Sequence, residues 1–226
     1  MITHPKDYFY EGADFLAVFR IWEGGMAIYG ALLFGGIGVW YGAKQAGIRF
    51  WSVADAVAPG LLIAQGIGRL GNFFNQELYG LPTDLPWALE IPASNSAYPA
   101  GLPEGLTFHP TFLYEMIWNL AAAGLLIYLG KRLNLQWGKQ FALYAILYST
   151  GRLWIESIRI DPSEIILGLR VNIWSALIGI AIGVTLLVVQ LRRHPGLEPS
   201  IWLPGRESVA ESAKKPRKTA KEPTEI

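Results

Sequence analysis

The chain has 226 residues, of which 52% are hydrophobic and only 16% are charged, a composition typical of a membrane protein rather than a soluble one. It contains no cysteine, which excludes disulfide bonds, thiolate metal sites and a cysteine nucleophile, and its three histidines are too scattered to indicate a metal site. The formal net charge of +1 conceals an excess of basic residues close to the C-terminal end, at Lys214, Lys215, Arg217, Lys218 and Lys221.

The elements expected along the chain are mostly membrane-spanning helices. Residues 1–25 form a polar segment without the apolar run of a secretory signal. The segments that follow are long and apolar enough to cross a bilayer of roughly 30 Å at about 1.5 Å per helical residue. They are residues 26–43, 53–73, 111–130, 140–158 and 172–191. The sequence therefore predicts an all-α, polytopic membrane protein, a helical bundle with about five spans within residues 26–193.

Lysines and arginines predict how the bundle is oriented. They gather in the first and third connections between the predicted spans and after the fifth, at Lys44, Arg49, Lys131, Arg132, Lys139, Arg192 and Arg193. The loop of residues 75–110 has none, so the positive-inside rule places that loop and residues 1–25 outside and the C-terminal end in the cytoplasm. Arg159 and Arg170 are exceptions to this rule, because they lie in the connection between the fourth and fifth spans, which the rule places outside. Acidic residues lie close to them in the sequence.

Two polar segments complete the predicted organisation. The loop of residues 75–110 is rich in Pro, Gly, Asn and Ser, and at this length it is either functional or poorly ordered. Residues 194–226 are polar, basic and contain proline, which predicts a disordered cytoplasmic tail, with contact to anionic lipid as the alternative to a solvated tail.

Polar side chains from three predicted spans share one depth. Arg69 and Asn72 lie on one face near the end of the second span, and a polar stripe with spacings of four, four and three runs along the fourth, at Tyr148, Arg152, Glu156 and Arg159. Ionisable residues at a span centre cost about 2.5 to 3.5 kcal/mol each and usually face a partner or a cavity. We expect the charged groups of this set to converge near the outer leaflet: Arg69, Glu77, Glu115, Arg152 and Glu156.

This polar set has a structural and a functional interpretation. In the structural one, Arg152 pairs with Glu156 within one helix, Arg69 pairs with Glu77, and arginines near helix ends reach the headgroups. In the functional one, two guanidiniums hold a phosphate in bidentate fashion, and a phospholipid headgroup is the anion available at that depth. The shared depth and the neighbouring asparagines favour the functional interpretation.

Four segments resemble the signature segments of the prolipoprotein diacylglyceryl transferase family in order and spacing. They are RIWEGGMAIYG (20–30), GRLGNFFNQELYG (68–80), HPTFLYE (109–115) and YSTGRLWIE (148–156). The resemblance covers roughly residues 20–193. It implies a multi-pass enzyme of the bacterial plasma membrane, with its active site toward the extracytoplasmic leaflet. Its reaction would transfer the diacylglyceryl group from phosphatidylglycerol to the lipobox cysteine thiol of a preprolipoprotein, forming a thioether and releasing glycerol phosphate.

The resemblance also implies which residues act. The catalytic candidates are Arg69, Asn72, Glu77, Arg152, Glu156 and Tyr29, and the candidates for substrate binding are Arg69, Arg152, Gly80, Tyr148, Asn75, Glu115 and His109. The expected partners are phosphatidylglycerol, the lipobox peptide and the bilayer, and we expect no metal, cofactor or nucleic acid. The arginines would stabilise charge on the departing glycerol phosphate, and the nucleophile would be the substrate's own thiol, whose ordinary pKa is about 8.5.

The chain departs from the family pattern in two places. Many members have a histidine where this chain has Tyr29, and tyrosine, with an ordinary pKa of about 10, is a poorer base at neutral pH. Three alternatives follow. The base is Glu77, Glu156 or His109, or the positive charge of the paired arginines alone favours the thiolate, or Tyr29 only positions the lipid. We favour the effect of the arginines. Members also carry additional spans before the GGM segment, so we expect either an internal start at Met1 or a fragment that lacks part of the site.

Three other functions remain as alternatives. One is a different phospholipid-headgroup transferase, and another is an inactive, truncated member of the family. The third is a non-enzymatic component of a lipid or anion transporter, which the absence of an internal repeat and the bias of the charges to one leaflet disfavour.

Overall fold

The computed structural model describes the backbone of residues 28–206 and the side chains of residues 34–206. Residues 28–206 contain five helices: α1 (Ile28–Ala46), α2 (Phe50–Asn75), α3 (Thr111–Leu133), α4 (Lys139–Ile158) and α5 (Val171–Arg193). They coincide with the five predicted segments, with ends that differ by a few residues, and they confirm the all-α class. The predicted N-terminal segment and residues 207–226 of the predicted tail lie outside the described residues.

The described chain divides into two compact units. The first contains residues 28–50 and 201–206, and the second contains residues 51–200. In the first unit, the chain after α1 pairs with the segment around Trp202, because Arg49 N–H donates to the Ile201 carbonyl at 2.8 Å and Leu203 N–H to the Gly47 carbonyl at 2.8 Å. Gly47 has a φ of 72°, a left-handed conformation that favours glycine.

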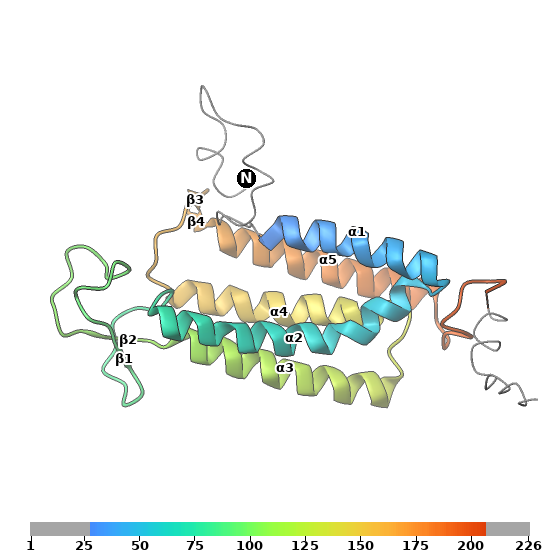
Figure 1. Cartoon of the computed structure of the whole chain (residues 1–226), viewed down its shortest axis with the longest axis horizontal. Helices are drawn as coiled ribbons and strands as arrows, with labels where there is room; N and C mark the ends of the chain where they lie inside the picture. The colour runs from blue at the N-terminus through green and yellow to red at the C-terminus, as the bar shows by residue number, and fades with distance from the viewer. Residues whose placement is uncertain (1–27, 207–226) are drawn as a thin grey trace, which may run out of the picture. The chain divides into compact units, whose positions relative to one another are not determined.

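In the second unit, α2 to α5 lie side by side, with each helix antiparallel to the one before it (Figure 1). The central core is made of Ala58, Leu62, Ala122, Ala123, Leu126 and Tyr144 from α2, α3 and α4. The α4–α5 contact is close because Gly183 has no side chain there: a Cβ would stand 2.8 Å from Ile146 Cγ1. Small residues at helix contacts are typical of membrane bundles.

Three of the described helices, α2, α3 and α5, are long and apolar enough to cross a membrane, with 26, 23 and 23 residues. Membrane crossing by α1 and α4 stays a prediction. Large apolar side chains are exposed along the outer faces of the three helices, for example Ile67, Ile117 and Ile182. Such faces suit contact with lipid rather than water.

A side chain of α2 caps the beginning of α4. The Asp55 carboxylate accepts the backbone N–H groups of Gly138 and Phe141, both at 2.8 Å. The Asp55 carbonyl cannot receive its usual helical hydrogen bond, because residue 59 is a proline, and it accepts the Gln140 side-chain amide at 3.2 Å instead. One residue thereby joins two helices that are far apart in the sequence.

The loop of residues 76–110 is folded, so poor order, one of its two predicted alternatives, does not describe it. Strand β1 (Leu89–Glu90) pairs with β2 (Thr107–Phe108) in antiparallel fashion. Tyr79, Ile91 and Phe108 form a small buried core, and burial, with a smaller contribution from Tyr98, raises the pKa of the Tyr79 hydroxyl. That hydroxyl donates to the Ala97 carbonyl at 2.6 Å.

A second hairpin connects α4 and α5. Strand β3 (Ile165–Ile166) pairs with β4 (Leu169–Arg170). The two residues of its turn, Leu167 and Gly168, have φ values of 51° and 79°. Positive φ at both positions is typical of the tight turns that match strand twist.

The beginning of the predicted disordered tail is ordered, which corrects the boundary expected at residue 194. The His194 ring stacks on Trp137, with ring centroids 4.1 Å apart. The Ser52 hydroxyl hydrogen-bonds to the Glu198 carboxylate at 2.8 Å, and the Glu198 N–H donates to the Gln136 side chain at 2.6 Å. These contacts hold residues 194–198 against the bundle, and composition alone does not reveal them.

Candidate functional site

The ends of four helices meet at one end of the second unit. The helices α2 and α4 run toward this end, and α3 and α5 begin there. We call it the site end. It brings together the charged side chains of an ionic network: Arg69, Glu115, Arg152, Glu156, Arg159, Asp161 and Arg170.

Glu115 joins the arginines of α2 and α4. Its Oε1 lies 2.9 Å from Arg69 Nη2, and its Oε2 lies 3.3 Å from Arg152 Nη1. Glu115 is only 4% exposed, so the two ion pairs compensate a carboxylate withdrawn from solvent. The predicted convergence of Arg69, Glu115 and Arg152 is therefore confirmed.

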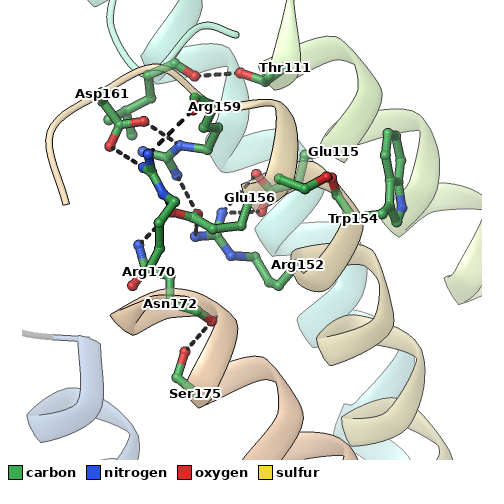
Figure 2. Close-up of polar contacts among 12 residues, drawn as sticks. Thr111, Glu115, Arg152, Trp154, Glu156, Arg159, Asp161, Arg170, Asn172 and Ser175 are labelled. Atoms are coloured by element: carbon green, nitrogen blue, oxygen red, sulfur yellow. Dashed lines mark hydrogen bonds and ion pairs between the residues drawn. The ribbon is translucent and has the colours of Figure 1, made fainter. Parts of the chain in front are cut away.

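Glu156 is the most enclosed carboxylate of the network, with an exposed fraction of 0%. Figure 2 shows it among the side chains of Arg152, Arg159 and Arg170. Its Oε2 lies 2.9 Å from Arg152 Nη2 and 3.6 Å from Arg159 Nη1. Its Oε1 accepts Arg170 Nε at 2.8 Å and Asn172 Nδ2 at 3.0 Å. The pairing of Arg152 with Glu156, expected from their spacing, is present, but it is one contact of a larger set.

Asp161 completes the network at the chain between α4 and α5. Its Oδ1 lies 2.6 Å from Arg159 Nε, and its Oδ2 lies 3.4 Å from Arg170 Nη2. Within the described residues, four guanidiniums and three carboxylates are thus linked by direct ion pairs. These directly paired groups carry a formal charge of +1, counted without the Glu77 carboxylate that joins them through an asparagine.

The carboxylate of Glu77 connects to this network through asparagine. Arg69 Nη1 donates to Asn72 Oδ1 at 3.3 Å, and Asn72 Nδ2 donates to Glu77 Oε1 at 3.1 Å. Asn75 Nδ2 donates to the same Glu77 oxygen at 3.1 Å. The direct pairing of Arg69 with Glu77, one part of the structural interpretation, is wrong, because Glu115 takes that place from the neighbouring helix.

Gly80 lies where two backbone segments meet. Its N–H donates to the His109 carbonyl at 2.9 Å, and the next residue donates to the Ile158 carbonyl at 2.8 Å. A Cβ on Gly80 would stand 2.8 Å from His109 Cβ and 2.9 Å from the Ile158 carbonyl oxygen. This close approach requires glycine whatever role it has toward a substrate.

His109 belongs to an aromatic group at the site end. Its Nδ1 lies 3.0 Å from the Tyr114 hydroxyl, which also accepts Trp87 Nε1 at 2.9 Å. The Tyr114 ring stacks against Trp154, with centroids 6.4 Å apart. The imidazole is thus held by aromatic neighbours, and the described contacts do not include one between His109 and the arginines.

The two candidate tyrosines differ in what can be said of them. Tyr148 lies one helical turn before Arg152 on α4, and its ring stacks on Tyr144 with centroids 6.2 Å apart. The backbone of Tyr29 lies in the first turn of α1, but its side chain is outside the described residues, so its role stays a prediction.

Three residues of the ionic network, and one asparagine that hydrogen-bonds to it, are absent from the sequence-based set of site residues. They are Arg159, Asp161, Arg170 and Asn172. Arg159 continues the polar stripe of α4. Arg159 and Arg170 are also the two residues that do not fit the positive-inside rule, so the sequence contains a reason to examine both. Asn172 had none, because a lone asparagine at the start of an apolar helix is an ordinary feature. No group of three His, Cys, Asp or Glu side chains in the described part of the chain is placed to hold a metal ion.

A bundle of apolar helices with an ionic network among four helix ends defines a helical membrane protein with a polar site at one end. The chain belongs to the prolipoprotein diacylglyceryl transferase family, whose sequence model matches residues 2–189.

Three bacterial relatives show the extent of the similarity. The phosphatidylglycerol–prolipoprotein diacylglyceryl transferase of Leifsonia xyli is 52% identical over 220 residues, which cover 94% of this chain and 66% of that protein. The protein so named in Streptomyces griseus is 48% identical over 209 residues, 92% of this chain and 62% of its own length. Transferase 1 of Streptomyces coelicolor is 47% identical over 210 residues, 93% of this chain and 60% of its own length. The chain therefore spans 60% to 66% of the length of these relatives.

Proposed function

We propose that the chain carries the phospholipid-binding and catalytic cluster of a phosphatidylglycerol–prolipoprotein diacylglyceryl transferase. The names of the relatives support phosphatidylglycerol and a prolipoprotein as the two substrates. The observation that carries the proposal is that the guanidiniums of Arg69 and Arg152 contact the two oxygens of one carboxylate, Glu115. A phosphodiester presents a similar pair of anionic oxygens, so two guanidiniums at this separation suit it.

The proposed reaction is a substitution at carbon. The thiol sulfur of the lipobox cysteine forms a bond to the glycerol carbon that bears the phosphate, and the bond between that carbon and the phosphate oxygen breaks. Glycerol phosphate leaves with the electron pair of the broken bond, and the thiol proton passes to the leaving phosphate oxygen or, through water, to the solvent. Arg69 and Arg152 act by opposing the negative charge that develops on the leaving oxygen.

Activation of the thiol is assigned to the positive field of the arginines. A nearby cation favours the thiolate, which is the reactive form. Glu156 is a weaker candidate for the base, because three guanidiniums and Asn172 already occupy its two oxygens. Glu77 and His109 remain the other candidates for the base, and Tyr29 is left with the role of positioning the lipid.

The orientation of the site also belongs to the proposal. Basic residues of the second unit lie at the end opposite the site end, at Lys131, Arg132, Lys139, Arg192 and Arg193. By the positive-inside rule, that end faces the cytoplasm and the site faces the extracytoplasmic leaflet. A secreted lipobox peptide would meet the site there.

A transfer assay tests the proposed function. The chain as given, and the same chain extended upstream to the next start codon, are placed in phosphatidylglycerol vesicles with a fluorescent lipobox peptide. We expect the peptide to gain a diacylglyceryl group, with release of glycerol phosphate, in the extended form or in both. A peptide with serine in place of the lipobox cysteine should gain nothing.

Two results would contradict the proposal. Transfer to another acceptor but not to the cysteine peptide would indicate a different headgroup transferase. No transfer in either form, with both proteins folded in the vesicles, would indicate that the cluster has no such activity.

A further inference from the structure

A second polar layer lies one helical turn from the ionic network, toward the middle of the bundle. Gln65 precedes Arg69 by four residues on α2, and Asn119 follows Glu115 by four residues on α3. Because α2 runs toward the site end and α3 runs away from it, both displacements point in the same direction. Residues four apart share a helix face, so both amides lie beneath the network at about 6 Å along the helix axes.

The two amides have polar atoms that the described residues leave without a hydrogen-bond partner. Asn119 is only 1% exposed, and its Nδ2 is buried and unpartnered among the described residues. Gln65 Nε2 donates to the Tyr144 hydroxyl at 3.0 Å, and its Oε1 is likewise buried and unpartnered within residues 34–206. A tyrosine hydroxyl both donates and accepts, so the Gln65 amide keeps this hydrogen bond when its nitrogen and oxygen exchange places. In each orientation, the other atom of the amide is left without a partner among the described residues.

Unpartnered amide groups are costly at this position. The surrounding residues are the apolar core of α2, α3 and α4, and α2 approaches α3 closely, since a Cβ on Gly66 would stand 3.4 Å from Asn119 Cβ. Within a membrane, water is not freely available to complete the hydrogen bonds. Buried polar groups of this kind are completed by a bound water or by a ligand, and a ligand that enters the site end can supply the partner.

The position of the layer indicates the chemistry of that ligand. A phospholipid whose phosphate lies between Arg69 and Arg152 extends its glycerol backbone and acyl chains away from the headgroup, toward the middle of the bilayer. The first polar atoms met in that direction are the ester carbonyl oxygens, which only accept hydrogen bonds. An amide N–H group is a suitable donor to them.

We propose that Asn119, assisted by Gln65, binds the ester carbonyls of the diacylglyceryl group and so makes the site select diacyl over dialkyl lipids. This inference rests on the proposed function, because it takes the phosphate position from it. It adds two residues that neither the family signature segments nor the ionic network contains.

The test compares two lipids that differ only in the proposed contact. Diacyl phosphatidylglycerol and its dialkyl ether analogue of equal chain length have the same headgroup and the same bond to be broken, but the ether lacks the carbonyls. In the transfer assay, the catalytically active form of the chain should prefer the diacyl lipid in kcat/KM by roughly three- to tenfold, the range of one or two hydrogen bonds.

Variants assign the preference to the amides. Asn119→Leu should lower kcat/KM for the diacyl lipid and leave that for the ether nearly unchanged, so that the ratio approaches one. Gln65→Met should lower the same ratio by a smaller factor. Gln190→Met removes an amide that is also buried but lies at the opposite end of α5, and it should leave the ratio unchanged.

The outcomes separate this inference from the proposed function. Equal rates with the two lipids, or an equal fall of both rates in Asn119→Leu, would overturn the inference and leave the transferase proposal standing. Transfer from neither lipid would overturn both. The comparison of the two lipids in the unmodified protein tests whether the site selects diacyl over dialkyl lipids, even where a variant does not fold.

Discussion

Arg152 is the residue through which the two halves of the ionic network are joined. Its Nη1 contacts Glu115 at 3.3 Å and its Nη2 contacts Glu156 at 2.9 Å. A guanidinium can make both contacts because its nitrogens are held in a rigid plane, whereas a lysine offers a single nitrogen at the end of a flexible chain. Charge alone therefore does not replace this residue.

Arg152→Lys should lower the transfer rate by about 10²-fold, the magnitude found when a donor that stabilises developing charge is removed. The measurement is kcat/KM for the lipobox peptide in phosphatidylglycerol vesicles, compared with Arg192→Lys, which makes the same change at the other end of the bundle. A rate within twofold of the unmodified protein would show that a point charge suffices and that the bidentate contact is not used.

Part of the ionic network was predictable from the sequence, but the pairing of charges between helices was not. The spacing of Arg152 and Glu156 predicts their pairing, since residues four apart on a helix face one another. The partner of Arg69 is Glu115, which lies 46 positions away on another helix. Only the packing of α2 against α3 decides between Glu115 and the nearer Glu77, and no local pattern encodes that choice.

At the scale of elements, the beginning of α4 depends on a residue of α2. Gly138 occupies the position before the helix, with a φ of 82°, and has no side chain with which to cap it. The Asp55 carboxylate takes over this role by accepting the N–H of Phe141, the group that a local cap would bind. The cap therefore also fixes α4, and with it Arg152 and Glu156, against α2.

Asp55→Ala should lower the free energy of unfolding by about 1 to 2 kcal/mol, because two backbone N–H groups lose their acceptor. Asp55→Asn keeps one acceptor oxygen and should lie between the alanine variant and the unmodified protein. Unfolding by denaturant in detergent micelles gives these values. The control is Asp84→Ala, at an exposed position of the loop, which should change the free energy of unfolding by less than about 0.5 kcal/mol. An equal effect of Asp55→Ala and Asp84→Ala would rule out the capping role.

The five helices were predictable because each is a long apolar segment bounded by polar or glycine-containing sequence. The short strands of the loop were not, since β1 and β2 have two residues each and depend on the core around Phe108. The ordered segment of residues 194–198 was missed for a similar reason. Its contacts with Trp137 and Ser52 come from side chains far away in sequence, and its polar composition suggests disorder.

At the scale of the molecule, charge is divided between the two ends of the second unit. The site end holds arginines that are paired with carboxylates, and the opposite end holds lysines and arginines at the ends of α3 and α5 and at the start of α4. A membrane potential and anionic lipid act on unpaired charges much more than on compensated ones. This difference explains why Arg159 and Arg170 do not contradict the orientation that the basic residues of the opposite end predict.

The proposed orientation can be measured directly, because the chain has no cysteine of its own and a single introduced thiol is the sole reactive group. Ser94→Cys places it in the loop between α2 and α3, and Lys131→Cys places it near the end of α3; both positions are exposed. In intact cells, a membrane-impermeant maleimide should label the Ser94→Cys variant and reach the Lys131→Cys variant only after the membrane is opened. The opposite labelling pattern would place the ionic network on the cytoplasmic side, where a secreted peptide would not meet it. The transferase proposal would then be wrong, because it requires the site to face outward, even if the network binds phosphate.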